Sequence, residues 1–258
     1  LKIILFKRKG RGIELTRAGS ILQQHGIQIM QNLKSAEKDL RPYHHQQRDN
    51  ISLGVSGSHL VLPVFQRFSQ RHPEISLNVK EFSSEGTLKK LNDNAIDIGI
   101  IYQREIPPGM SSTLLFEDEI IAAVPLTHPL TKNDKLRPEQ LSDQPVIILN
   151  DSLLLRHVIT TELTKRKVTP NIICELDNHY SCLEYAEAQI GIAFITRSLF
   201  RSSPPKNVKL LSLGIPAFFH PVVLVHSEDL LLDTPTRYLL GQIKDLYTSE
   251  RPHRSEKE

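Results

Sequence analysis

The sequence has few cysteines, no long apolar run and none of the common nucleotide-binding motifs. Two cysteines in 258 residues exclude a disulfide scaffold and favour a reducing, cytoplasmic compartment. No apolar run approaches the roughly 18 residues of a membrane-spanning helix, so we expect no membrane partner. The absence of G-x-G-x-x-G and Walker sequences removes the usual signatures of dinucleotide and nucleoside triphosphate enzymes. What is present is a globular composition, 39% hydrophobic and 24% charged, which can bury a core.

Positive charge is concentrated in the first fifth of the chain. Residues 1–48 hold ten Lys or Arg against three Asp or Glu, whereas the net charge of the whole chain is only +3. A basic head on a slightly acidic body predicts that the head meets a polyanion such as nucleic acid, although a solvated basic surface has the same composition.

Residues 1–15 predict a basic β-hairpin. Four cations and two glycines stand within residues 7–12, between an apolar stretch and a strand-like alternation. Glycine supplies the dihedral angles of a tight turn, and cations at its tip can reach DNA phosphates. The candidate contacts to the DNA backbone are Lys7, Arg8, Lys9 and Arg11.

Residues 16–49 predict a long helix followed by a hydrophilic hinge. Thr16 is a suitable N-cap, and Pro42 should end the helix by about Arg41. Apolar and small residues recur every seven positions in two registers, which makes a narrow seam. The seam favours pairing with a second copy, as a homodimer or homotetramer, over packing on its own domain. The candidate seam residues are Leu22, Ile29, Leu33 and Leu40.

The remaining chain predicts an α/β fold in two lobes. Strand and helix patterns alternate twice, and a late strand at residues 222–225 is expected to return to the first lobe. The expected lobes are residues 50–127 plus 221–248, and residues 128–220. The expected crossovers lie near residues 125–130 and 216–221, and a disordered tail is expected at residues 249–258.

Several motifs resemble those of LysR-type transcriptional regulators. The N-terminal part is similar in Leu5-Phe6, Arg8, Arg11, Leu15-Thr16 and Ala18-Gly19, and the body in residues 68–75, 91–100, 128–130, 141–145 and 191–193. The resemblance implies a periplasmic-binding-protein-like effector domain preceded by a wing and a linker helix. It also implies that most of the winged helix-turn-helix, with its base-reading helix, would precede Leu1. Gln189 and Thr196 depart from the usual glycine and proline, which bears on the shape of the second-lobe pocket.

The effector site is expected in the cleft between the lobes. In open α/β sheets, ligands sit beyond the carboxyl ends of the strands, and several polar residues follow predicted strands here. A helix N-terminus with hydroxyls and amides, and without a fixed Arg or Lys, favours a small carboxylate or other oxyanion. The candidate effector-binding residues are Ser56, Ser58, His59, Tyr102, Asn150, Ser152, Asn178 and Thr196.

Three functions from different classes are weighed. The favoured one is a DNA-binding regulator that responds to a small-molecule effector, with promoter DNA, the effector and RNA polymerase as candidate partners. The alternative is a stand-alone solute-binding module, which would need export, whereas the N-terminus has no secretory pattern. The third, an enzyme, has only a near miss for G-x-S-x-G at residues 54–58. We therefore expect no catalysis, no metal site and no cofactor.

Overall fold

The computed structural model describes residues 3–10, 12–40, 49–103, 105–200 and 204–248. They belong to two compact units, residues 1–48 and residues 49–258. The expected tail and most of the expected hinge lie outside the described residues.

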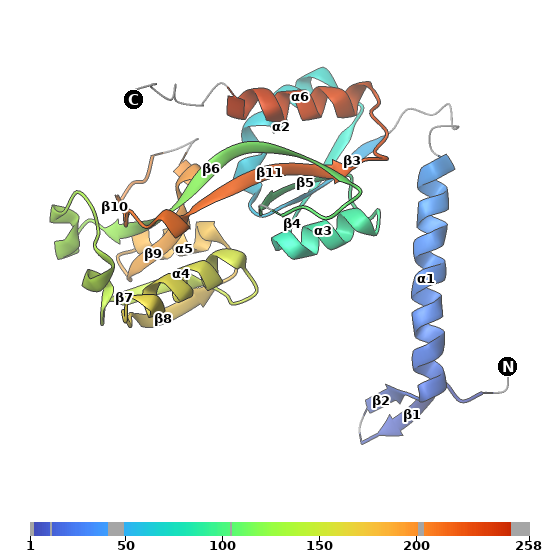
Figure 1. Ribbon diagram of the computed structural model, residues 1–258, viewed down its shortest axis with the longest axis horizontal. Coiled ribbons are helices and arrows are strands. Elements are labelled where there is room, and N and C mark those ends of the chain that lie inside the picture. Colours follow the sequence, from blue (N-terminus) through green and yellow to red (C-terminus); the bar gives the residue numbers. More distant parts are fainter. Residues whose placement is uncertain (1–2, 11, 41–48, 104, 201–203, 249–258) are drawn as a thin grey trace. The chain divides into compact units, whose positions relative to one another are not determined.

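The N-terminal unit opens with a two-stranded antiparallel hairpin (Figure 1). β1 (Phe6–Lys9) pairs with β2 (Gly12–Leu15). Gly10 in the turn has a φ of 58°, a left-handed conformation that glycine adopts without a Cβ clash. The predicted hairpin is confirmed. Arg11 lies outside the described residues, and the other candidate DNA contacts are exposed on β1: Lys7, Arg8 and Lys9.

α1 (Arg17–Leu40) starts on a cap that also holds the preceding segment. Thr16 Oγ1 accepts a hydrogen bond from the backbone N–H of Gly19 at 3.0 Å, so the predicted N-cap is confirmed. The same hydroxyl donates to the carbonyl oxygen of Ile4 at 2.8 Å. A Cβ on Gly19 would stand 2.1 Å from the carbonyl oxygen of Leu5, so only glycine permits this close approach.

The first lobe of the second unit is a mixed sheet with helices on both faces. Its strands run in the order β4 (Ser76–Glu81), β3 (Asn50–Val55), β5 (Ile98–Tyr102), β11 (Phe219–Ser227) and β6 (Met110–Pro125). The first three are parallel, and β11 is antiparallel to its neighbours. α2 (Leu62–Arg71) and α6 (Thr234–Thr248) pack on one face, and α3 (Ser84–Asn92) packs on the other (Figure 1).

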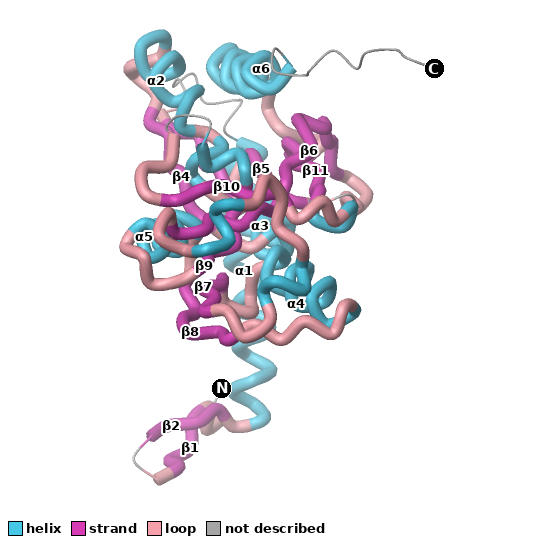
Figure 2. The backbone as a smooth tube through the Cα atoms, turned by 90° about the vertical axis from the view of Figure 1, so that its left-hand side faces the viewer, coloured by secondary structure: helices cyan, strands magenta, loops and turns pink. Residues whose placement is uncertain are grey.

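The second lobe is a sheet with its own apolar core. It consists of β10 (Val208–Ser212), the end of β6, β9 (Ile192–Thr196), β7 (Pro145–Leu149) and β8 (Asn171–Leu176), with α4 (Leu154–Lys165) and α5 (His179–Glu187). Short 3-10 helices are η2 (Ser58–Leu60), η3 (Pro129–Lys132), η4 (Pro138–Leu141), η5 (Arg197–Phe200) and η6 (Pro216–Phe218). Figure 2 shows α2 and α6 together, away from α4 and β8.

β6 belongs to both lobes, which corrects one expectation. Residues 110–119 pair with β11 in the first lobe, whereas residues 120–123 pair with β9 in the second. The chain therefore passes between lobes inside a continuous strand, and the expected first crossover at residues 125–130 was wrong. The second passage falls at η6 and the start of β11, close to the expected place, and residues 222–225 pair with β5 as predicted.

Candidate effector-binding site

A cavity of about 190 Å³ lies between the two lobes. It is placed where four parallel strands end: β3 and β4 in the first lobe, and β7 and β8 in the second. This is the position that the strand-end rule predicts for a ligand. Its lining residues are Ser56, Gly57, His59, Glu81, Phe82, Ser83, Asn150, Ser152, Leu153, Asp177, Asn178, His179 and Tyr180.

The structure brings most of the predicted site residues together. Five of the eight line this cavity: Ser56, His59, Asn150, Ser152 and Asn178. Tyr102 lines an adjoining recess of about 20 Å³ that shares Ser56 and His179 with the main cavity. Ser58 and Thr196 do not line the main cavity, and Thr196 is buried at the end of β9.

Ser58 corrects the expected anion site in the first lobe. Its backbone N–H donates to Glu81 Oε1 at 2.7 Å, so a carboxylate of the protein itself occupies this donor. The helix expected here is also interrupted, because η2 and then α2 replace a single α-helix. The Ser58 N–H, which the sequence predicted as a free donor for an anion, is therefore already taken.

Two other helix N-termini do face the cavity. α3 begins after its N-cap Ser83, whose hydroxyl accepts from the N–H of Gly86 at 3.1 Å. α5 begins after its N-cap Asn178, whose side-chain oxygen accepts from the N–H of Ser181 at 2.9 Å. The first N–H groups of each helix carry the positive end of the helix dipole toward the lining.

Three of the lining residues missed by sequence reasoning follow from one misread strand end. The strand pattern of β4 was read as ending at Val79, although the strand continues to Glu81. The strand-end rule applied two residues later finds the segment from Glu81 to Ser83. Asp177 directly precedes the predicted Asn178 and could have been found in the same way.

Asn150 organises the second-lobe side of the cavity. Its Nδ2 donates to Asp177 Oδ1 at 2.7 Å. Its Oδ1 accepts from the N–H of Ser152 at 2.9 Å and from the Ser152 hydroxyl at 2.6 Å. This set of bonds fixes the loop after β7 against the loop after β8.

Two histidines from opposite lobes meet in the cavity wall. The rings of His59 and His179 are 6.1 Å apart and nearly perpendicular. Burial lowers the pKa of His179 to about 4, although the nearby Glu81 charge opposes the shift. His179 is therefore neutral near pH 7. Its Nδ1 is buried and makes no hydrogen bond.

A buried network behind the cavity links the lobes. Asp118 on β6 accepts hydrogen bonds from the Tyr102 hydroxyl at 2.9 Å, from the Ser198 N–H at 3.0 Å and from the Glu119 N–H at 2.9 Å. The Ser198 hydroxyl also donates to Asp118, and it lies 3.0 Å from Nε2 of His59. Burial raises the pKa of Asp118, and these hydrogen bonds oppose the shift.

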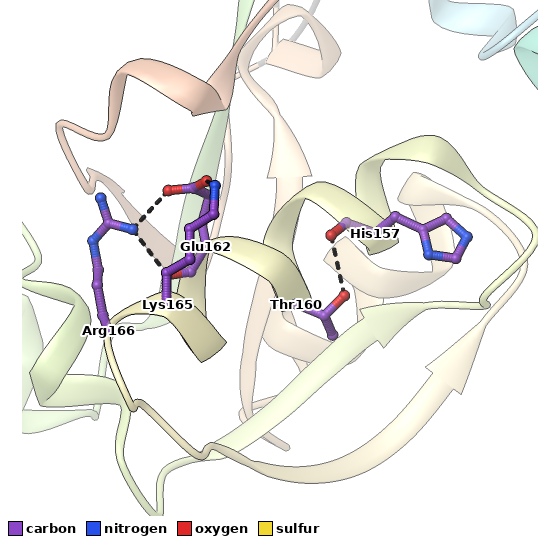
Figure 3. Close-up of polar contacts among 5 residues, drawn as sticks. All are labelled: His157, Thr160, Glu162, Lys165 and Arg166. Carbon is purple, nitrogen blue, oxygen red and sulfur yellow. Dashed lines mark hydrogen bonds and ion pairs between the residues drawn. The ribbon is translucent and has the colours of Figure 1, made fainter.

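A larger and more open pocket, of about 640 Å³, lies on another side of the lobe boundary. Tyr102 is the one predicted site residue that it touches. Its α4 wall includes Glu162, which pairs with Lys165 at 2.7 Å and Arg166 at 2.6 Å. These partners lower the pKa of Glu162. In Figure 3 Glu162, with Lys165 and Arg166, and the His157 side chain lie at different parts of α4.

Gln189 stands where the LysR-type pattern usually has glycine, and the structure shows how it is accommodated. It has a φ of 66°, which is a conformation that normally favours glycine. Its side chain accepts from the Thr127 hydroxyl at 2.6 Å and donates to the carbonyl of Asn207 at 2.9 Å. Gln189 does not line the cavity, so this departure acts on the loops of the second lobe.

Cations of the hairpin are partly paired. Lys9 Nζ lies 2.5 Å from Glu14 Oε1, and Lys7 Nζ lies 3.9 Å from Glu14 Oε2. Such exposed ion pairs contribute little to stability, and both lysines stay accessible.

Among the described residues, no three His, Cys, Asp or Glu side chains gather as a metal site requires. No helix in the described part of the chain has the length and apolar character to cross a bilayer.

Comparisons with known proteins agree with this architecture. Residues 44–247 match the LysR substrate binding domain family. A probable RuBisCO transcriptional regulator of Thalassiosira pseudonana is 28% identical over 226 residues, which is 83% of this chain and 73% of the relative. A second one, from Nostoc sp. PCC 7120, is 26% identical over 208 residues, 77% of this chain and 61% of the relative.

Solved structures share the fold. The effector binding domain of QuiR in complex with shikimate matches with a TM-score of 0.64 at 20% identity. The alignment covers 79% of this chain and 99% of the QuiR chain. Full-length BenM matches with a TM-score of 0.64 at 20% identity, and the alignment covers 96% of this chain and 83% of the BenM chain. The match over residues 44–247 spans most of the chain, which therefore belongs to the LysR-type transcriptional regulators and carries their effector-binding domain.

Proposed function

We propose that the full-length protein is a cytoplasmic, non-catalytic regulator that binds promoter DNA and responds to a small effector held in the inter-lobe cavity. The observation that carries the effector site is the meeting of five predicted polar residues in one cavity between the lobes. The hydroxyls, amides and helix N-termini of its lining are suited to a small carboxylate or other oxyanion. The shikimate bound by QuiR is a ligand of this class.

A matched pair of substitutions tests the cavity. Ser56→Leu places a bulky side chain in the lining, whereas Ser58→Leu makes the same change at a residue that does not line it. We expect Ser56→Leu to abolish the effector response while DNA binding is retained, and Ser58→Leu to preserve both. Calorimetry with effectors found in a thermal-shift panel of small acids, together with DNA binding by the full-length protein, measures the two properties. An unchanged response in Ser56→Leu places the site elsewhere.

The hairpin is proposed to contact DNA phosphates through Lys7, Arg8, Lys9 and Arg11. Phosphate contacts position a protein on DNA and do not read its sequence. Neutralising these residues should therefore weaken binding to all DNA sequences about equally. The slope of log affinity against log salt should become shallower by about 0.9 for each phosphate that the variant no longer neutralises. A sequence-selective weakening would contradict this role.

RNA polymerase is a further proposed partner.

α1 is proposed to pair with its copy in a homodimer or homotetramer. Within the described residues of the N-terminal unit its apolar seam is exposed, since Leu22 is 49%, Ile29 65% and Leu33 52% exposed. The side chain of Leu40, the fourth seam residue, lies outside the described residues. Leu22→Lys together with Ile29→Lys should dissociate the assembly and leave the effector domain folded, as measured by sedimentation and circular dichroism. A wild-type monomer would overturn the proposal.

The solute-binding alternative shares the cavity but not the N-terminal module. A full-length protein that binds the effector and never binds DNA would favour it over the regulator.

A further inference from the structure

The charges of the inter-lobe cavity are unlike those of a simple anion site. Two of its lining residues, Glu81 and Asp177, are carboxylates, one from each lobe. No Lys or Arg is among the described lining residues. His179, which also lines the cavity, is neutral near pH 7 because its burial lowers its pKa to about 4. An effector with negative charge alone would therefore enter a cavity that is already negative.

Both carboxylates are oriented by neutral donors. Glu81 accepts from the Ser58 N–H at 2.7 Å, and Asp177 accepts from Asn150 Nδ2 at 2.7 Å. Neither carboxylate forms an ion pair with a cationic side chain in the described part of the chain. Each keeps a second oxygen for another partner, and charge-assisted hydrogen bonds are the strongest that such an oxygen can make.

Glu81 lines the same cavity as the first residues of α5. Its charge acts on the pKa of both His179 and Tyr180, the first two residues of that helix. The carboxylate of the first lobe and the N-terminus of α5 in the second lobe therefore border the same space.

The same space also offers hydrogen-bond donors. The N-termini of α3 and α5, each nine residues long, face it, and the Ser83 hydroxyl, which lines it and accepts from the Gly86 N–H, keeps its own proton to donate. An independent sign of a missing partner is the buried Nδ1 of His179, which makes no hydrogen bond although the residue is only 6% exposed. A buried polar atom without a partner is costly.

We propose that the effector is a small zwitterion, an acid that also carries an ammonium group. Glu81 and Asp177 hold the ammonium, and the helix N-termini with the Ser83 hydroxyl receive the acid group. This inference rests on the proposed function, because it assigns a ligand class to the same cavity. The volume of about 190 Å³ lies below the roughly 300–1,000 Å³ of drug-sized sites, so the ligand is of amino-acid size.

Matched pairs of ligands test the ammonium. Calorimetry compares 2-amino acids with the 2-hydroxy acids of the same skeleton: alanine with lactate, serine with glycerate, aspartate with malate, and glutamate with 2-hydroxyglutarate. In at least one pair the amino acid should bind, and it should bind at least about tenfold more tightly than its hydroxy partner. If no amino acid of the panel binds, or if the hydroxy acids bind as well or better, the inference is overturned.

Charge-removing variants test the two carboxylates. Glu81→Gln and Asp177→Asn keep an oxygen that can accept the existing hydrogen bond, so both should fold with an unchanged circular dichroism spectrum. Each should weaken amino-acid binding at least about tenfold, with no loss for the hydroxy acid. Asp151→Asn, the matched control, removes an exposed charge outside the lining and should leave both affinities unchanged. Unchanged amino-acid affinity in both lining variants would overturn the inference.

The result for Ser56→Leu separates this inference from the proposed function. If hydroxy acids bind and Ser56→Leu abolishes their binding, the cavity is the effector site but its ligand is a plain anion. If Ser56→Leu leaves all binding unchanged, the effector site lies elsewhere and both proposals fall.

Discussion

Tyr102→Phe should measure how strongly the buried network holds the two lobes. The substitution removes the hydroxyl that donates to Asp118 at 2.9 Å and leaves the ring, so it opens no large cavity. A hydrogen bond to a charged group contributes about 1.5–3 kcal/mol, and Asp118 keeps its donors from Ser198 and Glu119. We therefore expect the free energy of unfolding to fall by about 2 kcal/mol. For a unit of this size, that change lowers the melting temperature by about 4–8 °C.

The pH dependence of this effect provides a second test. The pKa of Asp118 is raised in the folded protein, so the folded state binds more protons than the unfolded state between the two pKa values. The contribution of Asp118 to stability is therefore favourable at low pH and is lost as the pH rises through the folded pKa. Without the Tyr102 donor this pKa rises further, so the effect of Tyr102→Phe should be largest at neutral pH and shrink toward about pH 4.

Thermal and urea denaturation of the wild type and the variants supply the measurement. Tyr185→Phe is a matched control, because Tyr185 is 39% exposed on α5 and should change stability by less than about 0.5 kcal/mol. Ser198→Ala removes a second donor, and the double variant with Tyr102→Phe gives the coupling between them. Equal effects of Tyr102→Phe and Tyr185→Phe, or an effect independent of pH, would refute the reasoning.

Three further predictions concern single residues. Gly19→Ala should destabilise α1 by about 1–3 kcal/mol, because its Cβ clashes with the backbone of Leu5. Gly26→Ala, whose Cβ meets no atom within 4 Å, should stabilise α1 by about 1 kcal/mol. Thermal denaturation of the whole chain, followed by circular dichroism, compares the stability of α1 in the two variants. The pKa of His179 is lowered to about 4, so the folded state loses stability as the pH falls from about 6.5 to about 4, by up to about 3 kcal/mol. His179→Gln should remove this loss, so that the free energy of unfolding measured in urea changes less over that pH range. Cys182 is buried and its pKa is raised to about 12, so it should react with Ellman's reagent only after unfolding.

Elements with a strong local pattern were predicted from the sequence. The buried run of β5 is apolar at nearly every position because both faces of the sheet are covered. α1 carries its start in Thr16 and its seam in a seven-residue repeat. The hairpin before it carries glycines at the turn. In each case the residues within the element itself determine its conformation.

Elements defined by pairing across the fold were not predicted. The first half of β6 mixes polar and apolar residues without strict alternation and is mostly half-buried or exposed, so its sequence does not distinguish it from a loop. β10 is short and gains its place by pairing with the second half of β6. The passage between lobes inside β6 depends on which strands lie beside it, and a pattern read along one strand does not contain that information.

The candidate site shows the same division between local and tertiary information. The strand-end rule found the cavity and five of its residues, because the direction of parallel strands follows from the order of elements. It did not find the charge of the cavity, because Glu81 and Asp177 were outside the residues it considered. Fold similarity at 20% identity shows the fold but not the ligand. Two carboxylates are enough to change which ligands such a cavity favours, so the ligand class has to be argued from this chain's own side chains.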